Sequence, residues 1–289
     1  MKYWKSFSIR GCKQEADALQ AFLESFDALS VTLEDAEDQP LLEPLPGETP
    51  IWDQIVITAL FSEEFNEKKL MNALEKKALP YAYKTVEDQL WEVVWQKDFS
   101  PRLFGEILWV VPTWCTPPEP DKPYILMDPG LAFGSGTHPT TALCLEWLAH
   151  NSARLKESTL LDFGCGSGIL AIAAAKLGAK LVYGIDIDPQ ALISTQNNAE
   201  QNQVNKKIQT GFADFKTPQV DVLIANILAN PLKALSLEMK SRLKPQGVLA
   251  LSGIMSDQAN EVILAYEPWI NLNVSQTKEG WVILSGVNH

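Results

Sequence analysis

The sequence predicts an α/β protein in two parts, a small α+β unit followed by a larger domain built on a mostly parallel sheet. Three observations support this. Strand-like and helix-like segments alternate along the chain. A glycine turn within residues 159–177 joins a strand-like run to an alanine-rich helical pattern. A proline-rich segment at 112–123 separates the two parts, and a chain of 289 residues has room for two ordinary domains.

The first hundred residues read as strand, helix and strand, twice over. The strand-like segments have alternating or β-branched apolar residues, and the helical ones have apolar residues at helical spacing. The strands are expected at 3–9, 29–33, 55–61 and 81–86, and the helices at 14–26 and 64–77. This order is the split βαβ, ferredoxin-like pattern. We therefore expect a ferredoxin-like domain over residues 1–100, with an acidic, proline-rich loop at 34–50 and a further helix at 90–99.

Residues 101–123 are expected to form a semi-rigid linker with an extended stretch at 107–111, and residues 124–289 the second domain. In that domain, apolar runs alternate with helical patterns, which implies a parallel sheet covered on both faces. The expected strands lie at 159–161, 181–185, just before Asp214, and at 220–225, 248–252, 270–275 and 280–284. Together they predict a Rossmann-like domain with a seven-stranded mixed sheet.

The glycine turn is the most informative stretch of the chain. Residues 160–168 read LLDFGCGSG, so Gly164 and Gly166 follow directly after the first strand of the domain. Glycine at such a turn lets the backbone approach a nucleotide-like ligand, because no Cβ stands in the way. Asp186 lies 22 residues after Gly164, at the end of the second strand. A carboxylate in that place can accept hydrogen bonds from both ribose hydroxyls.

The spacing of the turn distinguishes between ligands. A dinucleotide site has the pattern G-x-G-x-x-G, whereas the glycines here alternate with single residues and Asp162 precedes them. A carboxylate beside the turn would repel a pyrophosphate but suits a ligand with an ammonium group. We therefore expect S-adenosylmethionine (AdoMet), bound by Asp162, Gly164, Gly166 and Asp186. A glycine triplet alone can also be a plain turn, and a nucleotide-dependent oxidoreductase is the rival enzyme class.

Three further positions are candidates, each with two interpretations. The loop at 128–141, including Thr141, could close over the carboxylate end of a ligand, or it could be a capped helix start with Pro139 in the first turn. Asn226, after the fourth strand, could accept a hydrogen bond from a substrate amine, or it could cap a helix. Asp214, after the third strand, could accept from the adenine amino group or be a solvated loop residue.

The charge and composition of the chain limit the classes of partner that it can bind. The net charge is −12, and the first 115 residues contribute −9 of it, with 11 Lys and Arg against 20 Asp and Glu. Nucleic-acid affinity rests on basic residues, so we expect no direct nucleic-acid binding. A basic protein partner is favoured, although acidic charge also serves solubility. The four cysteines have no metal-type spacing and no apolar run is long enough for a membrane span, so we expect a cytoplasmic monomer without metal.

Several motifs together resemble one known family, that of PrmA, the methyltransferases of large-subunit ribosomal protein L-eleven. The length and the N-terminal pattern also match, so that the resemblance covers essentially the whole chain. The motifs are WEVVWQKDFSPRLFGEILWVVPTW (91–114), LMDPGLAFGSGTHPTT (126–141), LLDFGCGSGILAIAAAKLGA (160–179), GIDIDPQA (184–191) and NILANPL (226–232).

The resemblance implies AdoMet-dependent N-methylation of lysine side chains and of the N-terminal α-amine of that ribosomal protein. It also implies that the ferredoxin-like domain recognises the substrate and that Thr141, Gly164, Asp186 and Asn226 contact AdoMet. Asn226 is followed by Ile-Leu-Ala rather than by Pro-Pro and an aromatic residue, which suits flexible amines. Another basic protein or RNA is the alternative acceptor, and an acidic adaptor without catalysis is disfavoured by the intact motifs.

Overall fold

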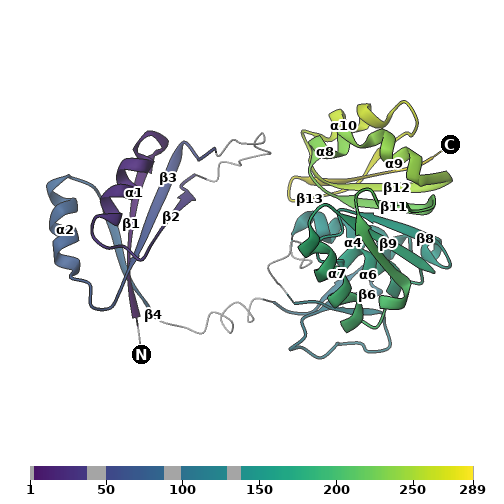
Figure 1. Ribbon diagram of the computed structural model, residues 1–289, viewed down its shortest axis with the longest axis horizontal. Coiled ribbons are helices and arrows are strands. Elements are labelled where there is room, and N and C mark those ends of the chain that lie inside the picture. Colours follow the sequence, from purple (N-terminus) through teal and green to yellow (C-terminus); the bar gives the residue numbers. More distant parts are fainter. Residues whose placement is uncertain (1–2, 38–49, 88–98, 129–137, 289) are drawn as a thin grey trace. The chain divides into compact units, whose positions relative to one another are not determined.

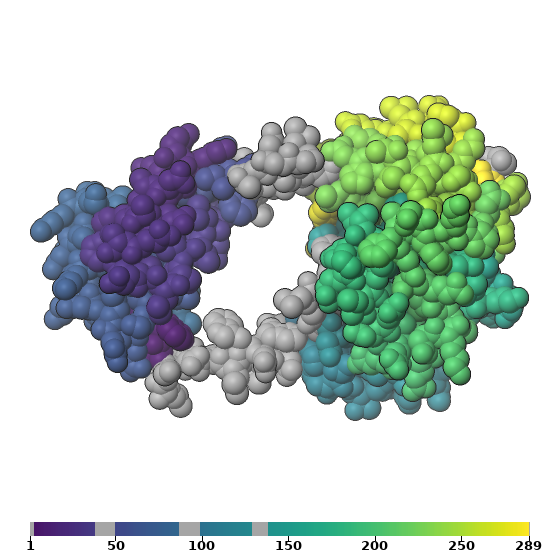
Figure 2. Space-filling model, viewed as in Figure 1, coloured from purple at the N-terminus to yellow at the C-terminus, as the bar shows by residue number. Residues whose placement is uncertain are grey.

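The computed structural model describes residues 3–37, 50–87, 99–128 and 138–288. The chain divides into two compact units, Met1–Asp98 and Phe99–His289, which are described separately. Figure 2 shows the outer surface of the described residues from the same side as Figure 1. None of the helices in these residues is long and apolar enough to cross a membrane.

Unit 1 is a four-stranded antiparallel sheet with helices on one face (Figure 1). The order of the strands in the sheet is β2-β3-β1-β4. The elements are β1 (Tyr3–Cys12), α1 (Ala16–Glu24), β2 (Ser30–Asp35), β3 (Gln54–Phe61), α2 (Glu67–Lys76) and β4 (Tyr81–Glu87), with a short 3-10 turn, η1 (Lys13–Glu15), before α1. Alternate residues of β1 and β3, such as Phe7 and Ile57, pack against Leu23 and Leu74 of the helices. This confirms the ferredoxin-like pattern, whereas the helix expected at 90–99 and most of the loop at 34–50 lie outside the described residues.

Unit 2 contains the expected seven-stranded mixed sheet, in the order β10-β9-β8-β11-β12-β14-β13. Its strands are β8 (Thr159–Phe163), β9 (Leu181–Asp186), β10 (Ile208–Phe212), β11 (Val220–Asn226), β12 (Leu243–Met255), β13 (Asn273–Lys278) and β14 (Trp281–Val287). Strand β14 runs in the direction opposite to the other six strands. The chain leaves β8 toward β9 on one side and later returns to place β11 on the other. The carboxyl ends of β8 and β11 therefore form the switch point where such sheets bind ligands.

Helices cover both faces of this sheet, with α4, α6 and α7 on one and α8, α9 and α10 on the other (Figure 1). The helices of the unit are α4 (Pro139–His150), α5 (Ser152–Leu155), α6 (Ile169–Lys176), α7 (Pro189–Gln201), α8 (Ala229–Ala234), α9 (Ser236–Arg242) and α10 (Ala259–Tyr266), with a 3-10 turn, η3 (Asn205–Lys207). Neighbouring residues of a strand alternate between the two layers: Leu160 packs with α6, and Leu161 with the opposite layer. Both layers are needed because a parallel strand is buried on both faces.

The linker expected at 101–123 is wrong, because these residues belong to unit 2. The extended stretch expected at 107–111 is found, but as a strand of that unit. Residues 102–111 form β5 (Arg102–Phe104) and β6 (Leu108–Val111), which join β7 (Tyr124–Leu126) in a three-stranded sheet of unit 2. Phe104, Leu108 and Val110 are buried in the same core as α4 and α6. The segment folds with unit 2 because burying these apolar side chains there is favourable. The boundary between the units accordingly falls at Asp98 rather than in the proline-rich segment.

Candidate functional site

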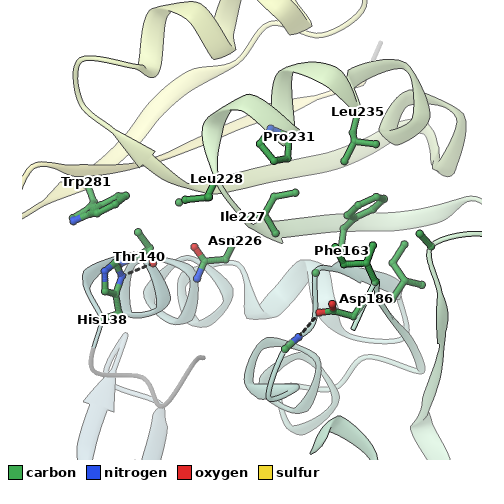
Figure 3. Close-up of a pocket in the computed structure, with 16 residues that line it drawn as sticks. His138, Thr140, Phe163, Asp186, Asn226, Ile227, Leu228, Pro231, Leu235 and Trp281 are labelled. Carbon is green, nitrogen blue, oxygen red and sulfur yellow. Dashed lines mark hydrogen bonds between the residues drawn. The ribbon is translucent and has the colours of Figure 1, made fainter. Parts of the chain in front are cut away.

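A cavity of about 660 Å³ lies at the switch point of the seven-stranded sheet (Figure 3). This volume is in the range of sites for small molecules and cofactors. The lining is mostly apolar, and Asp186 and His138 are its only titratable members among the described residues. The lining residues are His138, Thr140, Phe163, Gly164, Gly166, Ile185, Asp186, Ile187, Ala213, Asn226, Ile227, Leu228, Pro231, Leu235, Gly253 and Trp281.

The glycine turn and the end of β9 are held together at one end of this cavity. The backbone N–H groups of Gly164 and Cys165 both donate to the carbonyl of Ile185, at 2.8 and 3.0 Å. The N–H of Gly166 donates to Oδ2 of Asp186 at 2.9 Å, and the N–H of Asp188 donates to Oδ1 at 3.0 Å. Each carboxylate oxygen keeps further lone pairs, so Asp186 can accept from a ligand while these bonds persist. The side chain is therefore positioned before a ligand arrives.

Two glycines make room for the segment after β11. Gly164 has φ of +80°, and a Cβ there would lie 2.4 Å from Cγ2 of Ile227. Gly253, in an irregular part of β12, has φ of +85°, and a Cβ there would lie 2.3 Å from the carbonyl oxygen of Ile227. Both positions need glycine for conformation as well as for space. Gly164 therefore makes room for the side chain of Ile227, in addition to any ligand.

Asn226 is the last residue of β11 and lines the middle of the cavity (Figure 3). Its Nδ2 donates to Oγ1 of Thr141 at 3.3 Å, and Thr141 is fully buried on α4. Its Oδ1 is buried and has no hydrogen-bond partner in the described part of the chain. A buried acceptor without a partner is costly, so this oxygen is a candidate to accept from a donor on a ligand. The capping interpretation is wrong, because α8 begins at Ala229 with Leu228 as its N-cap.

The model of one protein family, described as "Ribosomal protein L11 methyltransferase (PrmA)", matches residues 3–289. A protein of that name from Glaesserella parasuis is 46% identical over 98% of this chain and 98% of its own length. One from Acinetobacter baylyi is 43% identical over 99% and 98%. The crystal structure of a ribosomal protein L11 methylase from Lactobacillus delbrueckii is similar with a TM-score of 0.60 and 33% identity, covering 66% of this chain and all of that one.

The chain belongs to this family. The match spans both units, so the family relation covers the ferredoxin-like unit as well as the domain that carries the cavity. The Rossmann-like fold and the resemblance drawn from the sequence motifs are thereby confirmed.

The structure brings Gly164, Gly166, Asp186 and Asn226 together around one cavity, as the sequence predicts. Thr141 is instead buried behind Asn226, where it holds the amide. Asp214 is exposed in the turn after β10, beside the lining residue Ala213, and its contact with an adenine stays a prediction. Most of the loop at 128–141 lies outside the described residues. The last residues of this loop agree with the interpretation as a capped helix start, because His138 caps α4 and Pro139 is the first residue of that helix.

Asp162 belongs to β8, with its side chain toward α6, and is not part of the cavity wall described above. It is fully buried, and its Oδ2 accepts from the N–H of Ala171 at 3.0 Å. Its Oδ1 has no partner in the described ranges. Burial raises the pKa of this carboxyl to about 7, and the Asp186 charge adds to the rise. A direct contact between Asp162 and the ammonium group of AdoMet therefore stays a prediction, and a role inside the fold is better supported.

Replacing Asp162 by Asn is expected to change how stability depends on pH. The folded state keeps a proton on Asp162 between about pH 4 and about pH 7, where the unfolded chain releases it, so the free energy of unfolding falls as pH rises through this window. An asparagine has no such titration, so between pH 5 and pH 8 the variant gains about 3 kcal/mol of stability relative to the unaltered chain. Urea unfolding at pH 5 and pH 8 measures the difference. Identical pH dependence in both proteins would contradict it.

The ribose assignment predicts different effects for two neighbouring carboxylates. Asp186→Ala is expected to weaken AdoMet binding by about 2 kcal/mol or more, because charge-assisted hydrogen bonds are lost. Asp188 is the matched control, since its Oδ1 accepts from the N–H of Gln190 and caps α7. Asp188→Ala is expected to cost about 1 kcal/mol of stability and little affinity. Calorimetry with AdoMet measures the loss of affinity in each variant, and thermal melting measures the loss of stability. Equal losses of affinity in the two variants would refute the assignment.

Sequence reasoning did not single out most of the lining residues, among them His138, Leu228, Gly253 and Trp281. His138 and Trp281 are far apart in the chain, yet their rings meet at 5.1 Å between centroids with an angle of 67°. No local pattern predicts such a pair, because it depends on how α4 and β14 pack. A weak signal was available for Trp281, because it directly follows Gly280 at the start of the strand expected at 280–284.

Proposed function

We propose that this chain transfers methyl groups from AdoMet to lysine side chains and to the N-terminal α-amine of ribosomal protein L11. The observation that carries the proposal is the buried, unpartnered Oδ1 of Asn226 at the switch-point cavity. An acceptor atom in that place fits an N–H donor on the substrate. The relatives' names give the ribosomal protein as the acceptor for those proteins.

The residues present fit AdoMet. The glycine turn offers backbone at close range, Asp186 offers two oriented carboxylate oxygens, and the apolar lining suits the rest of an adenosine. When bound, AdoMet supplies a methyl group already activated by its sulfonium. The contribution of the chain is then mainly positioning. Asp186 orients the ribose, and Oδ1 of Asn226 accepts a hydrogen bond from the amine and directs its lone pair at the methyl carbon.

A lysine amine has a reference pKa of about 10.4, so it must lose a proton before it attacks. Asn226 has no basic group and cannot take it. Burial lowers the pKa of His138, with a smaller opposing effect of Glu279, so this lining residue is neutral at pH 7. The proton passes to solvent or to a group of the substrate complex in this proposal.

In the proposal, unit 1 recognises the substrate. Ribosomal proteins that contact RNA carry basic surfaces, and the first 115 residues of this chain contribute −9 of its net charge of −12. The same charge disfavours RNA as the acceptor. The enzyme would act as a monomer in the cytoplasm.

The test supplies labelled AdoMet with purified ribosomal protein L11 and, separately, with ribosomal RNA. We expect label in the protein and none in the RNA. Label in RNA alone would overturn the choice of acceptor, while failure to bind AdoMet in calorimetry would overturn the methyltransferase chemistry itself. A parallel titration with NAD is expected to give no heat of binding.

A further inference from the structure

One end of the cavity is aromatic and differs from the end that holds Asp186. Figure 3 shows Trp281 and His138 together at this end, Asp186 at the opposite end and Asn226 between them. The indole of Trp281 meets the ring of His138 edge to face. Trp281 is the first residue of β14 and pairs with Met255 of β12, so the sheet fixes its backbone. The indole at the aromatic end is therefore carried by a strand of the sheet and not by a loop.

A carboxylate lies near this aromatic end. Glu279 is exposed in the turn before Trp281. Burial lowers the pKa of His138, and the Glu279 charge acts in the opposite direction. Within the described lining, no Lys or Arg competes for the indole. An aromatic face with a carboxylate nearby and no cation of its own attracts a positively charged group from the substrate.

We propose that Trp281 is the residue that binds the methyl-accepting nitrogen, with its indole face stabilising the positive charge of the amine by a cation–π contact. The inference rests on the function proposed above. In the transfer, the nitrogen lone pair forms the new N–C bond, and the electron pair of the breaking C–S bond stays on sulfur. Positive charge therefore passes from sulfur to nitrogen, and the indole stabilises it where it develops.

Trp281 and Asn226 would then have complementary tasks. The Oδ1 of Asn226 accepts only from a nitrogen that still has a hydrogen. The indole face binds a cationic nitrogen whether its substituents are hydrogens or methyl groups. Trp281 therefore matters most for amines that already carry methyl groups, and it sets how far an amine is methylated.

The experiment compares choline with its uncharged carbon isostere, dimethylbutanol, as probes titrated into the full chain loaded with S-adenosylhomocysteine. The two probes share shape and differ in charge. We expect the full chain to bind choline about 5- to 30-fold more tightly, as a desolvated cation–π contact allows. Trp281→Leu is expected to abolish this preference, and Trp281→Phe to keep most of it. Glu279→Gln, which leaves the indole in place, is expected to reduce it only partly.

Equal binding of both probes by the unaltered chain overturns the proposal, as does a preference that survives in Trp281→Leu. A preference lost in Glu279→Gln but kept in Trp281→Leu would assign it to the carboxylate instead. If Trp281→Leu fails to fold, as judged by melting and by AdoMet titration, the comparison of the two probes on the unaltered chain still tests the proposal, because equal binding overturns it. Because these titrations need no methyl transfer, they remain informative if ribosomal protein L11 proves not to be the acceptor.

Discussion

Asn226→Ser is expected to lower the rate of methyl transfer by about 10- to 1000-fold, the loss that follows when a reacting pair is misplaced by about an ångström. Serine is shorter, so its hydroxyl cannot reach the place that Oδ1 of Asn226 occupies at the cavity. The side chain does not cap α8, whose N-cap is Leu228, so the melting temperature is expected to change little. Single-turnover transfer at saturating AdoMet, together with a melting curve, measures both.

Thr141→Val is the matched control for this prediction. It removes the oxygen that accepts from Nδ2 of Asn226 at 3.3 Å, while the amide itself remains. We expect a smaller loss of rate, because the amide is less well held but still present. An Asn226→Ser variant that transfers methyl at the unaltered rate would show that the amide does not orient the amine.

A shortened chain of residues 99–289 is expected to bind AdoMet but to lose methylation of ribosomal protein L11. Every described lining residue of the cavity lies between 138 and 281, so unit 1 contributes none of them. The shortened chain must begin at Phe99, because a start after β6 would remove Leu108 and Val110 from the core of unit 2. Calorimetry with AdoMet and a transfer assay with the ribosomal protein measure the two properties.

A free amine supplied at high concentration serves as the control for the shortened chain. Slow methylation of that amine is expected to persist, because the cavity and Asn226 are retained. Full activity of residues 99–289 on ribosomal protein L11 would contradict the assignment of substrate recognition to unit 1. Loss of AdoMet binding in a folded protein would contradict the assignment of the cofactor site to unit 2.

The sequence predicted the elements that depend on local signals. Apolar runs that stop at glycine or polar residues predicted the ends of the strands. They placed the turn at Gly164 and Gly166, and they placed Asp186 and Asn226 at strand ends. Parallel strands end at one edge of a sheet, so these residues meet without any knowledge of the loops. The fold of unit 1 was predicted for the same reason, since its helices and strands alternate with clear periods.

The residues that sequence reasoning misplaced depend on packing between distant segments. The strands β5 and β6 are only three and four residues long, too short for a periodic signal, and β6 pairs with β7 across the proline-rich segment. Asp162 faces α6 because of the pleat of β8, which a residue count from the turn does not reveal. The contact between Trp281 and His138 joins the start of β14 to the start of α4.

The central claim is that amine nitrogens of ribosomal protein L11 receive the methyl group. Peptide mass spectrometry of that protein, after incubation with the full chain and AdoMet, tests it most directly. We expect mass increases in steps of one methyl group, confined to lysine side chains and the N-terminal α-amine, and strongly reduced with Asn226→Ser at the same short incubation time. Methyl groups on other side chains, or an unmodified protein alongside intact AdoMet binding, would contradict it.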